Sequence, residues 1–242
     1  MLGGREKVVV CWSGGKDSAM ALHEIAQDCR YDVISLITTC SEEFGRVCAH
    51  GVRVELAAQQ ADSIGLPLET VYVKTHASND EYRKAMAQCL LAQAARGVTA
   101  VVFGDIFLED LRAWREAELA QIGLRAIFPL WRRDTRGIIA EYIERGFESV
   151  ICCVSDACLD ERALGRTIDW SFVNALPATV DPCGENGEFH TFAFNGPIFK
   201  EPIPYDVGRT VYRPIEYGSQ EVTGPKGFWF CDLVPVTVTW AQ

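Results

Sequence analysis

A short polar stretch near the N-terminus has the residue types needed to hold a polyphosphate. Its six residues are Ser13, Gly14, Gly15, Lys16, Asp17 and Ser18. The two glycines let backbone N–H groups approach a ligand closely, and a helix that begins here adds the positive end of its dipole. The lysine supplies a cation, the serines supply hydroxyl donors, and the aspartate orders the loop or holds Mg²⁺ against the phosphates. We therefore expect a nucleotide to bind here; an ordinary capped glycine turn is the alternative.

Two further positions carry polar groups where strands are expected to end. Gly104 and Asp105 follow the apolar run Ala100–Phe103, and open parallel sheets bind ligands at the carboxyl ends of their strands. Gly104 permits close approach and Asp105 presents a carboxylate for magnesium or ribose, or else caps the helix expected from Leu108. His50 lies in a glycine-containing loop after the second expected strand, where a nucleotide pocket commonly has a wall.

The first half of the chain alternates short apolar runs with helical patterns, which predicts a parallel sheet of five strands covered by helices on both faces. The expected strands are Lys7–Cys11, Asp32–Thr38, Leu68–Val73, Ala100–Phe103 and Leu124–Phe128. The expected helices are Ser18–Cys29, Val52–Ile64, Asn79–Ala95 and Leu108–Ile122, and Gly65, Gly97 and Gly123 punctuate the ends of three of them.

The pattern changes after about Pro129. One more helix (Thr135–Arg145) and one more buried strand (Val150–Val154) continue the earlier alternation, but the chain beyond Asp181 is β-rich. The segments EFHTFAF, GRTVYRPIEYG and GFWFCDLVPVTVTW alternate apolar and polar residues, which indicates short antiparallel strands. We expect an ATP-binding domain at residues 1–130 and a smaller substrate-cleft domain at 131–242.

Composition and net charge argue against a membrane protein and against a nucleic-acid partner. The 242 residues are 48% hydrophobic and 23% charged, with no apolar stretch near membrane-spanning length and no signal peptide pattern, which predicts a cytoplasmic protein without a membrane partner. The formal net charge of −10 disfavours a nucleic-acid partner, because affinity for nucleic acid depends on cations at the phosphates. The composition does not define the oligomeric state, and a homodimer is one candidate.

The ten cysteines show no C-x-x-C spacing, so most are expected to be reduced core residues. Cys152 and Cys153 are adjacent on an expected strand, where their side chains point to opposite faces, and core packing explains them better than a redox pair. Cys183 is the exception, expected to be exposed at a cleft.

Four stretches resemble a known family. The SGGKDS stretch lacks the earlier glycine of a Walker P-loop and resembles instead the PP-loop of the N-type ATP pyrophosphatases. HGVR at His50–Arg53, FGDIFLEDLRAWRE at Phe103–Glu116 and DPCGENGEFHTFAFNGPIF at Asp181–Phe199 resemble the diphthine–ammonia ligase family, in its bacterial branch. The resemblance spans the chain and implies a Rossmann-like α/β fold of the adenine nucleotide alpha hydrolase-like type.

The resemblance implies a ligase that uses ATP, and from the residues themselves we expect Asp17 and Asp105 to hold Mg²⁺. ATP would adenylate an acceptor carboxylate, release pyrophosphate, and let ammonia displace AMP; the family's acceptor is the diphthine side chain of elongation factor 2. Lys16 would meet the phosphates. Glu185 and Glu188 would orient ammonia or hold a cation, and His190 would move protons near neutral pH; a solvated hairpin turn is the alternative.

Two positions depart from the family pattern. Where E-G-G-E-[YF]-E-T is expected, the chain has ENGEFHT, so Asn186 replaces a glycine and His190 replaces a glutamate. On the helix after Asp105, the resemblance favours Arg112 or Glu109 at the cleft, whereas Glu109, Arg112 and Arg115 would otherwise form a solvated face. The alternative functions are a PP-loop sulfur transferase acting on tRNA, and a module that binds AMP or ATP without turnover.

Overall fold

A computed structural model of the chain describes residues 4–75, 77–215 and 226–236. Its first sheet contains five parallel strands, as the sequence predicts, together with the short antiparallel β3 (Arg46–Val47) beside β2. The parallel strands are β1 (Glu6–Cys11), β2 (Tyr31–Ser41), β4 (Leu68–Val73), β5 (Ala100–Val102) and β6 (Arg125–Ile127). β1 lies between β2 and β5, β4 pairs with the far edge of β2, and β6 pairs with β5.

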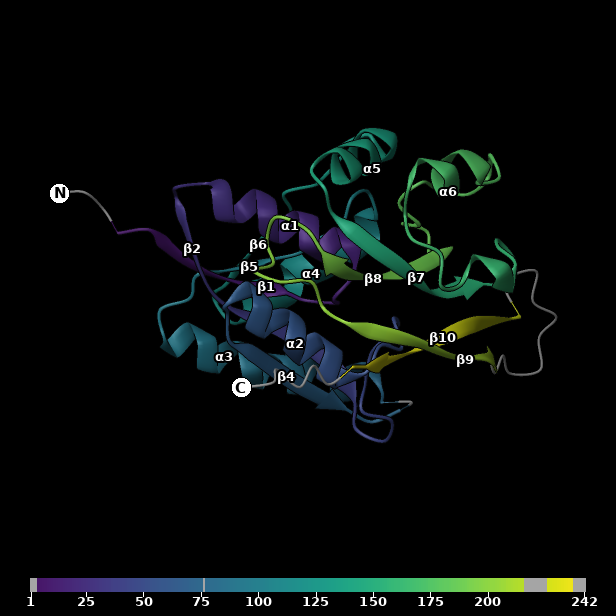
Figure 1. Cartoon of the computed structure of the whole chain (residues 1–242). Helices are drawn as coiled ribbons and strands as arrows, with labels where there is room; N and C mark the ends of the chain where they lie inside the picture. The colour runs from purple at the N-terminus through teal and green to yellow at the C-terminus, as the bar shows by residue number, and fades with distance from the viewer. Residues whose placement is uncertain (1–3, 76, 216–225, 237–242) are drawn as a thin grey trace, which may run out of the picture.

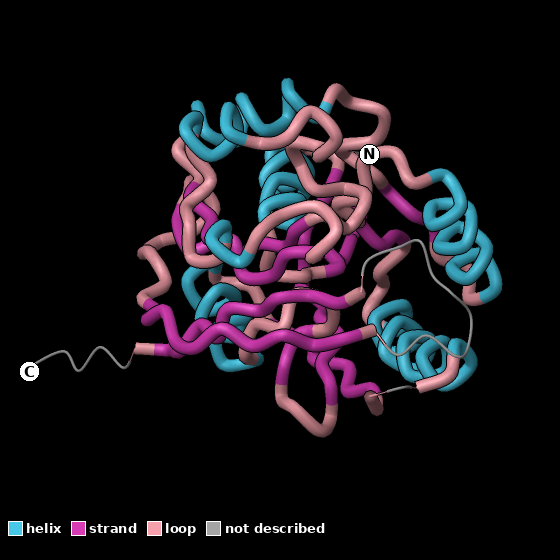
Figure 2. Tube along the Cα trace, turned by 90° about the vertical axis from the view of Figure 1, so that its right-hand side faces the viewer, coloured by secondary structure: helices cyan, strands magenta, loops and turns pink. Residues whose placement is uncertain are grey.

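Helices cover both faces of this sheet because successive strand residues point to opposite sides. Val8 and Val10 of β1 belong to one core cluster, whereas Val9 belongs to another. The first cluster includes residues of α1 (Lys16–Gln27), α2 (Val54–Ile64) and α5 (Thr135–Glu144), and the second includes residues of α3 (Asn79–Ala95) and α4 (Glu109–Gln121). Figure 2 shows the strands in the interior with helices around them.

The five helices expected from the sequence are all present, with ends that differ by at most two residues. Three glycines expected at helix ends have positive φ there, and Gly65 is the left-handed cap of α2. The elements not predicted are short: β3, the 3₁₀ turn Glu161–Ala163 and α6 (Trp170–Ala175).

A second sheet forms from later parts of the chain and lies beside the first in Figure 1. Its strands run in the order β8 (Phe189–Asn195), β7 (Glu148–Ser155), β10 (Gly227–Pro235) and β9 (Tyr205–Pro214), and all neighbours are antiparallel. This confirms the predicted β-rich, antiparallel C-terminal region. The ends of two predicted segments, residues 216–218 and 237–240, lie outside the described residues.

The strand predicted at Val150–Val154 is present, but its place differs from the prediction. It does not continue the parallel sheet; as β7 it pairs antiparallel with β8 and β10. Seven of its eight residues are buried, because it lies in the middle of the second sheet. A continuous apolar run indicates that both faces of a strand are buried. It does not distinguish a strand of the parallel sheet from a central strand of an antiparallel sheet.

Side chains from the two sheets pack together in one hydrophobic core cluster. The first core cluster joins Val8 of β1 to Ile151 of β7, and α5 packs Ile139 and Tyr142 into it. The predicted domain boundary after residue 130 falls in the turn before α5 and stays a prediction. Within the described part of the chain, no helix combines the length and apolar character needed to cross a membrane.

Candidate active site

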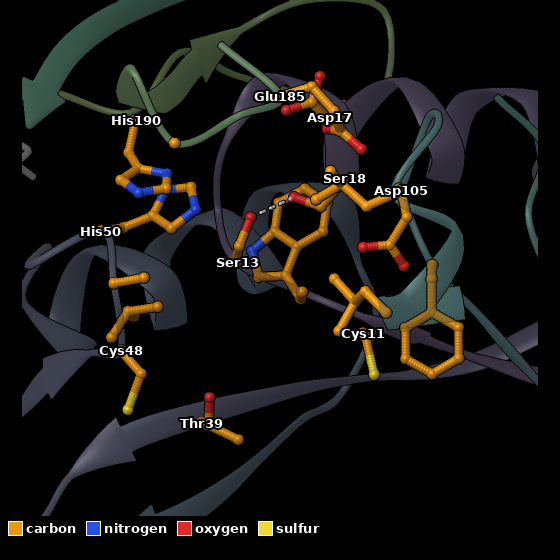
Figure 3. Close-up of a pocket in the computed structure, with 18 of the residues that line it drawn as sticks. Cys11, Ser13, Asp17, Ser18, Thr39, Cys48, His50, Asp105, Glu185 and His190 are labelled. Atoms are coloured by element: carbon orange, nitrogen blue, oxygen red, sulfur yellow. Dashed lines mark hydrogen bonds between the residues drawn. The ribbon is translucent and has the colours of Figure 1, made fainter. Parts of the chain in front are cut away.

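A pocket of about 650 Å³ opens at the carboxyl end of the parallel sheet and collects residues from distant parts of the sequence. Its lining includes the loop 13–18 except its glycines, the segment Val47–His50, Phe103–Asp105 after β5, and parts of Gly184–Thr191. Figure 3 shows Ser13, Asp17, Ser18, His50, Asp105, Glu185 and His190 around this space. The pocket therefore brings together most of the site residues that the sequence singled out.

The loop 13–18 turns sharply into α1 and is held by its own hydroxyl groups. Gly14 has φ of +76°, a conformation that favours glycine. The hydroxyl of Ser18 donates to the carbonyl oxygen of Gly15 at 2.9 Å, and the N–H of Gly15 donates to Ser13 Oγ at 3.2 Å. A Cβ at Gly15 would lie 2.6 Å from His50 Cε1, so the second glycine is required by the close approach of the histidine loop.

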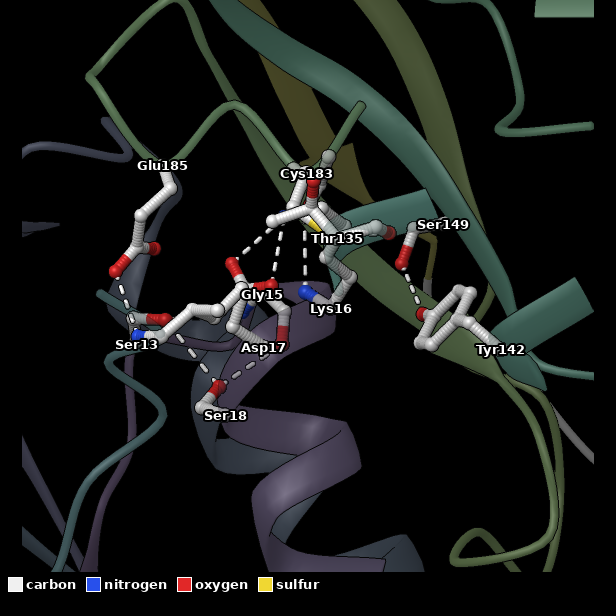
Figure 4. Close-up of polar contacts among 12 residues, drawn as sticks. Ser13, Gly15, Lys16, Asp17, Ser18, Thr135, Tyr142, Ser149, Cys183 and Glu185 are labelled. Carbon is white, nitrogen blue, oxygen red and sulfur yellow. Dashed lines mark hydrogen bonds and ion pairs between the residues drawn. The ribbon is translucent and has the colours of Figure 1, made fainter. Parts of the chain in front are cut away.

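Lys16 and Asp17 form an ion pair inside the pocket, with 2.7 Å between Nζ and Oδ2 (Figure 4). Burial lowers the pKa of Lys16, but Asp17 and the neighbouring Cys183 and Glu185 together outweigh it, so the pKa is raised and the lysine is charged at neutral pH. Burial raises the pKa of Asp17 although Lys16 opposes this effect. The lysine is thus a buried cation whose present partner is a carboxylate that an incoming phosphate could replace.

The second sheet contacts the loop directly through β8. The N–H of Ala193 donates to the carbonyl oxygen of Gly14 at 2.8 Å, and the N–H of Lys16 donates to Thr191 Oγ1 at 3.0 Å. One of the loop's N–H groups therefore already has a partner from a residue 175 positions later in the chain. The shape of the nucleotide loop depends on the C-terminal part of the protein.

Gln60 of α2 is a residue that sequence reasoning missed, although its side chain joins the loop to β8. It is fully buried, and its Nε2 donates to the carbonyl oxygens of Gly14 and Ala193 at 2.9 and 2.6 Å. Its Oε1 accepts from the indole N–H of Trp12 at 2.9 Å. The sequence did hold a signal: Gln60 interrupts the apolar face formed by Leu56 and Ala61 of the same helix.

Gly104 and Asp105 both line the pocket, but their partners differ from those expected. A Cβ at Gly104 would lie 2.8 Å from the backbone carbon and oxygen of Asp17, so this glycine lets the strand end pack against the loop. Asp105 does not cap α4, whose N-cap is Leu108 without a side-chain hydrogen bond. Its carboxylate pairs instead with Arg115, with Nε to Oδ2 at 2.8 Å.

The arginine that reaches the pocket from α4 is therefore Arg115, and the expectation of Arg112 or Glu109 is corrected. Arg112 packs over the rings of Phe128 and Trp131 and pairs with Glu116. The Glu109 side chain is 70% exposed and pairs with Arg132. Leu111 and Arg115 lie on the face of α4 that lines the pocket, and Arg112 does not. The pattern of charges along the helix did not show which face this is.

Glu185 enters the pocket beside Asp17 (Figure 3). Its Oε1 accepts hydrogen bonds from the N–H groups of Ile106 and Phe107 at 2.7 and 3.4 Å. Burial raises the pKa of Glu185 to about 7, while the Ile106 N–H acts in the opposite direction. A carboxyl group that titrates near neutral pH at a cleft can exchange a proton with a bound substrate.

Glu188 has a different position from the one the sequence suggested. Its side chain is buried, is not among the residues lining the pocket, and accepts hydrogen bonds from the N–H groups of Asp181 and Asn186 at 3.0 and 2.9 Å. The amide of Asn186 adds a third bond to the same carboxylate at 3.0 Å. This geometry corrects the expected contact with substrate: Glu188 shapes the turn that presents Glu185.

His50 and His190 lie against each other at the pocket wall, with ring centroids 4.7 Å apart (Figure 3). Burial lowers the pKa of His50 to about 4, and burial together with His50 holds the pKa of His190 well below its ordinary value. Both rings are neutral at pH 7, so His190 does not gain and lose a proton near neutral pH as the sequence suggested. His50 is fixed by a 2.9 Å contact between its Nδ1 and the carbonyl oxygen of Thr191.

The cysteines are free thiols, and five of the ten are buried, including Cys152 and Cys153 as expected. Cys183 departs from its expected exposure: its side chain is 1% exposed and its Sγ contacts the carbonyl oxygen of Thr135 at 3.4 Å (Figure 4). Cys11 and Cys48 line the pocket, where burial raises the pKa of Cys11 to about 12 and also raises that of Cys48.

Two family models match this chain, one in each half. Residues 6–126 match the family model of the diphthamide synthase N-terminal domain, and residues 134–216 match that of the diphthamide synthase C-terminal domain. The chain belongs to the diphthamide synthase family. The loop 13–18 falls within the first matched region and the turn 184–191 within the second, so the candidate active site is built from both regions of this family.

Individual relatives are distant. The chain is 27% identical over 164 residues to the diphthine–ammonia ligase of Rattus norvegicus and 25% identical over 243 residues to that of Danio rerio. The rat match covers 63% of this chain and 61% of the relative, whereas the zebrafish match covers 92% and 93%. The matched part thus spans about 61% of the rat relative's length. The solved structure of the U34-tRNA thiolase NcsA from Methanococcus maripaludis matches at 18% identity over 59% of each chain with a TM-score of 0.37, which is too low to bear on function.

Proposed function

We propose that this diphthamide synthase family member is an ATP-dependent ligase that forms an amide between an acceptor carboxylate and ammonia. One observation carries the proposal: the loop 13–18 and the turn 184–191 line the same pocket. The first has the groups that bind phosphates, and the second supplies a carboxyl group with a pKa of about 7. A single cleft with both sets of groups suits a reaction that joins nucleotide chemistry to proton transfer.

In the first step, an oxygen of the acceptor carboxylate would attack the α-phosphorus of ATP and expel pyrophosphate. The N-terminus of α1, the hydroxyls of Ser13 and Ser18, and Lys16 Nζ would bind the phosphates. The lysine is buried and charged, so it would stabilise the negative charge that develops on the leaving pyrophosphate. Gly104 would keep the strand end close to the loop and hold the phosphate-binding surface in shape.

In the second step, ammonia would attack the carbonyl carbon of the acyl-adenylate, and AMP would leave. The nitrogen must lose a proton as the amide forms, and Glu185 in its carboxylate form would accept it. Its raised pKa matches that role at neutral pH, because a base poised near the working pH is both deprotonated and basic enough. Two backbone N–H groups fix one of its oxygens.

Mg²⁺ is proposed to bind together with ATP rather than in a cage of protein ligands. The described residues contain no group of three or more His, Cys, Asp or Glu side chains placed to hold a metal ion. Asp17 and Asp105 offer the hard oxygen ligands that Mg²⁺ prefers, and the phosphates would complete its coordination. The ion would neutralise phosphate charge. Lys16 and Arg115, the present partners of these carboxylates, would then be freed toward the nucleotide.

The decisive test is exchange of radiolabelled pyrophosphate into ATP with a panel of carboxylates that includes diphthine-bearing elongation factor 2. A ligase shows exchange that depends on one acceptor and forms an amide when ammonia is added. Lys16→Ala should slow exchange strongly. Lys7→Ala, which replaces an exposed lysine of β1 outside the pocket, should retain it. ATP binding with no exchange for any acceptor would instead support a nucleotide-binding module.

The acceptor is expected to depend on His190. Its neutral ring lies tilted against that of His50 at the wall of the pocket, where the family pattern has a carboxylate. His190→Glu places a buried anion there and should abolish activity on the native acceptor, whereas His190→Gln, which stays neutral, should retain much of it. Equal activity of both variants on the same acceptor would show that this position does not select it.

The sulfur transferase alternative receives no support from the pocket. Such chemistry needs thiolates, and burial raises the pKa of both lining thiols, Cys11 and Cys48. Formation of a thiolated tRNA by the purified protein would overturn the ligase proposal directly.

A further inference from the structure

A second pocket of about 350 Å³ lies behind the segment Val47–Ala49, which forms part of its wall and part of the wall of the nucleotide pocket. It is lined by residues of the β2–β3 turn, the end of β4, β9 and β10, and none of the residues 13–18 or 184–191 takes part. The proposed ligase reaction makes no use of it.

The second pocket contains a surplus of positive charge. Arg46, Lys74 and Arg213 line it, and Asp232 is the one acidic residue among its described lining. Asp232 is already shared by two arginines, at 2.9 Å from Arg46 and 2.8 Å from Arg53, and these bonds hold its pKa at about 2. The carboxylate is therefore neutralised within the protein, and the cationic side chains face the space with charge to spare.

Its remaining walls are apolar, and part of this apolar surface is exposed. Phe44 and Val211, 48% and 40% exposed, are two of the six exposed large hydrophobic residues described, and both line the pocket with Phe230. The Arg213 guanidinium lies 4.6 Å from the centre of the Phe44 ring, so the cationic and apolar groups meet at one place. Glu42 and Glu43, next to Phe44 in the same turn, are exposed and do not line the pocket.

We propose that the second pocket is a binding site for a small organic anion, with a carboxylate, sulfonate or phosphate group attached to an apolar body. An uncharged apolar ligand would remove water from Lys74 and Arg213 without replacing it. An inorganic anion would leave Phe44, Val211 and Phe230 in contact with water. A ligand with both parts satisfies both requirements. This inference does not depend on the ligase reaction, because it concerns different residues.

The test uses 8-anilinonaphthalene-1-sulfonate, which joins a sulfonate to aromatic rings, and its uncharged analogue N-phenyl-1-naphthylamine, which lacks the sulfonate. Fluorescence titration of the full chain should show saturable binding of the sulfonate that weakens with added salt, and weaker binding of the analogue. Arg213→Ala should weaken sulfonate binding about two- to fivefold, the range expected for a partly exposed ion pair. Phe44→Ala should weaken both probes.

Two exposed residues outside the second pocket provide matched controls: Arg209 on the same strand as Arg213, and Tyr72 on β4. Arg209→Ala and Tyr72→Ala should leave the affinity unchanged, and far-ultraviolet circular dichroism should confirm that all four variants fold. The proposal is overturned if Arg213→Ala and Phe44→Ala bind the sulfonate as tightly as the wild-type protein does. It is also overturned if the two control variants lose as much sulfonate affinity as the two pocket variants do. Equal affinity for the two probes would overturn its charge requirement.

Discussion

Replacing Gln60 by leucine should destabilise the protein and impair the nucleotide pocket at the same time. The side chain is fully buried and has three partners: Trp12 Nε1, the carbonyl oxygen of Gly14 and the carbonyl oxygen of Ala193. Leucine has a similar volume but can neither donate nor accept a hydrogen bond. Buried polar groups would therefore lose partners without gaining water.

The size of the effect follows from counting the groups left without a partner. Gly14 O keeps its bond from the N–H of Ala193, so the indole N–H and the Ala193 carbonyl oxygen are the two that are stranded. That carbonyl points the same way as its own N–H, away from β7, because both backbone groups of a strand residue face the same side. At about 1–3 kcal/mol for each group, the free energy of unfolding should fall by about 2–6 kcal/mol.

Urea denaturation followed by circular dichroism measures this loss, and isothermal titration with ATP measures the consequence for the loop. Gln59→Leu is the matched control, because the buried Oε1 of the neighbouring Gln59 has no described hydrogen-bond partner. Its loss leaves no other group without a partner and should not lower the free energy of unfolding. ATP affinity should fall in Gln60→Leu alone. Equal stability and ATP affinity in the two variants would refute the argument that Gln60 holds the loop.

Four other predictions concern the same pocket. Gly104→Ala should impair ATP binding, because the added Cβ would lie 2.8 Å from the backbone of Asp17; Gly4→Ala, with nothing within 4 Å, is the control in the same titration. Amide formation should decline as pH falls through about 7, where Glu185 becomes protonated, and Glu185→Gln should remove that limb of the rate profile; an unchanged limb would assign it to another group. Lys16→Ala should raise the activation free energy of turnover by about 2–4 kcal/mol and weaken ATP binding less. Equal losses of turnover and ATP affinity in steady-state kinetics would indicate that the lysine only anchors ATP. Stability should fall between pH 6.5 and 4, because the unfolded chain binds a proton at His50 more tightly than the folded one; denaturation of His50→Gln should show a shallower fall.

The elements of the parallel sheet could be predicted because their patterns are local. The capping box at Ser78 and Glu81 marks the start of α3, whose predicted bounds match the structure. The setting of β7 could not be predicted in the same way. Whether a doubly buried strand pairs in parallel or antiparallel depends on partners far along the chain, and those partners leave no trace in the strand itself.

The candidate site shows the same division. The loop 13–18 has its polar groups and its glycines within six residues, so its place in the pocket was predictable. Glu185 and Glu188 are only three positions apart, but each follows a glycine with positive φ, Gly184 and Gly187, which turns the backbone. One carboxylate enters the pocket while the other binds the turn. Side-chain direction within such a turn follows from backbone angles that the spacing of carboxylates does not encode.

The hydrogen bonds between β8 and the loop 13–18 have a consequence for the order of events during synthesis. The loop leaves the ribosome early, but Thr191 and Ala193, which bond to it, follow some 175 residues later. Contacts of such high sequence separation form late, since the intervening chain must first be brought into place. A nascent chain that ends before β8 would carry the complete phosphate-binding sequence and still lack the partners that give it its shape. Competence to bind nucleotide would then arise nearly at the end of translation, and a ribosome-stalled series of growing length would date it.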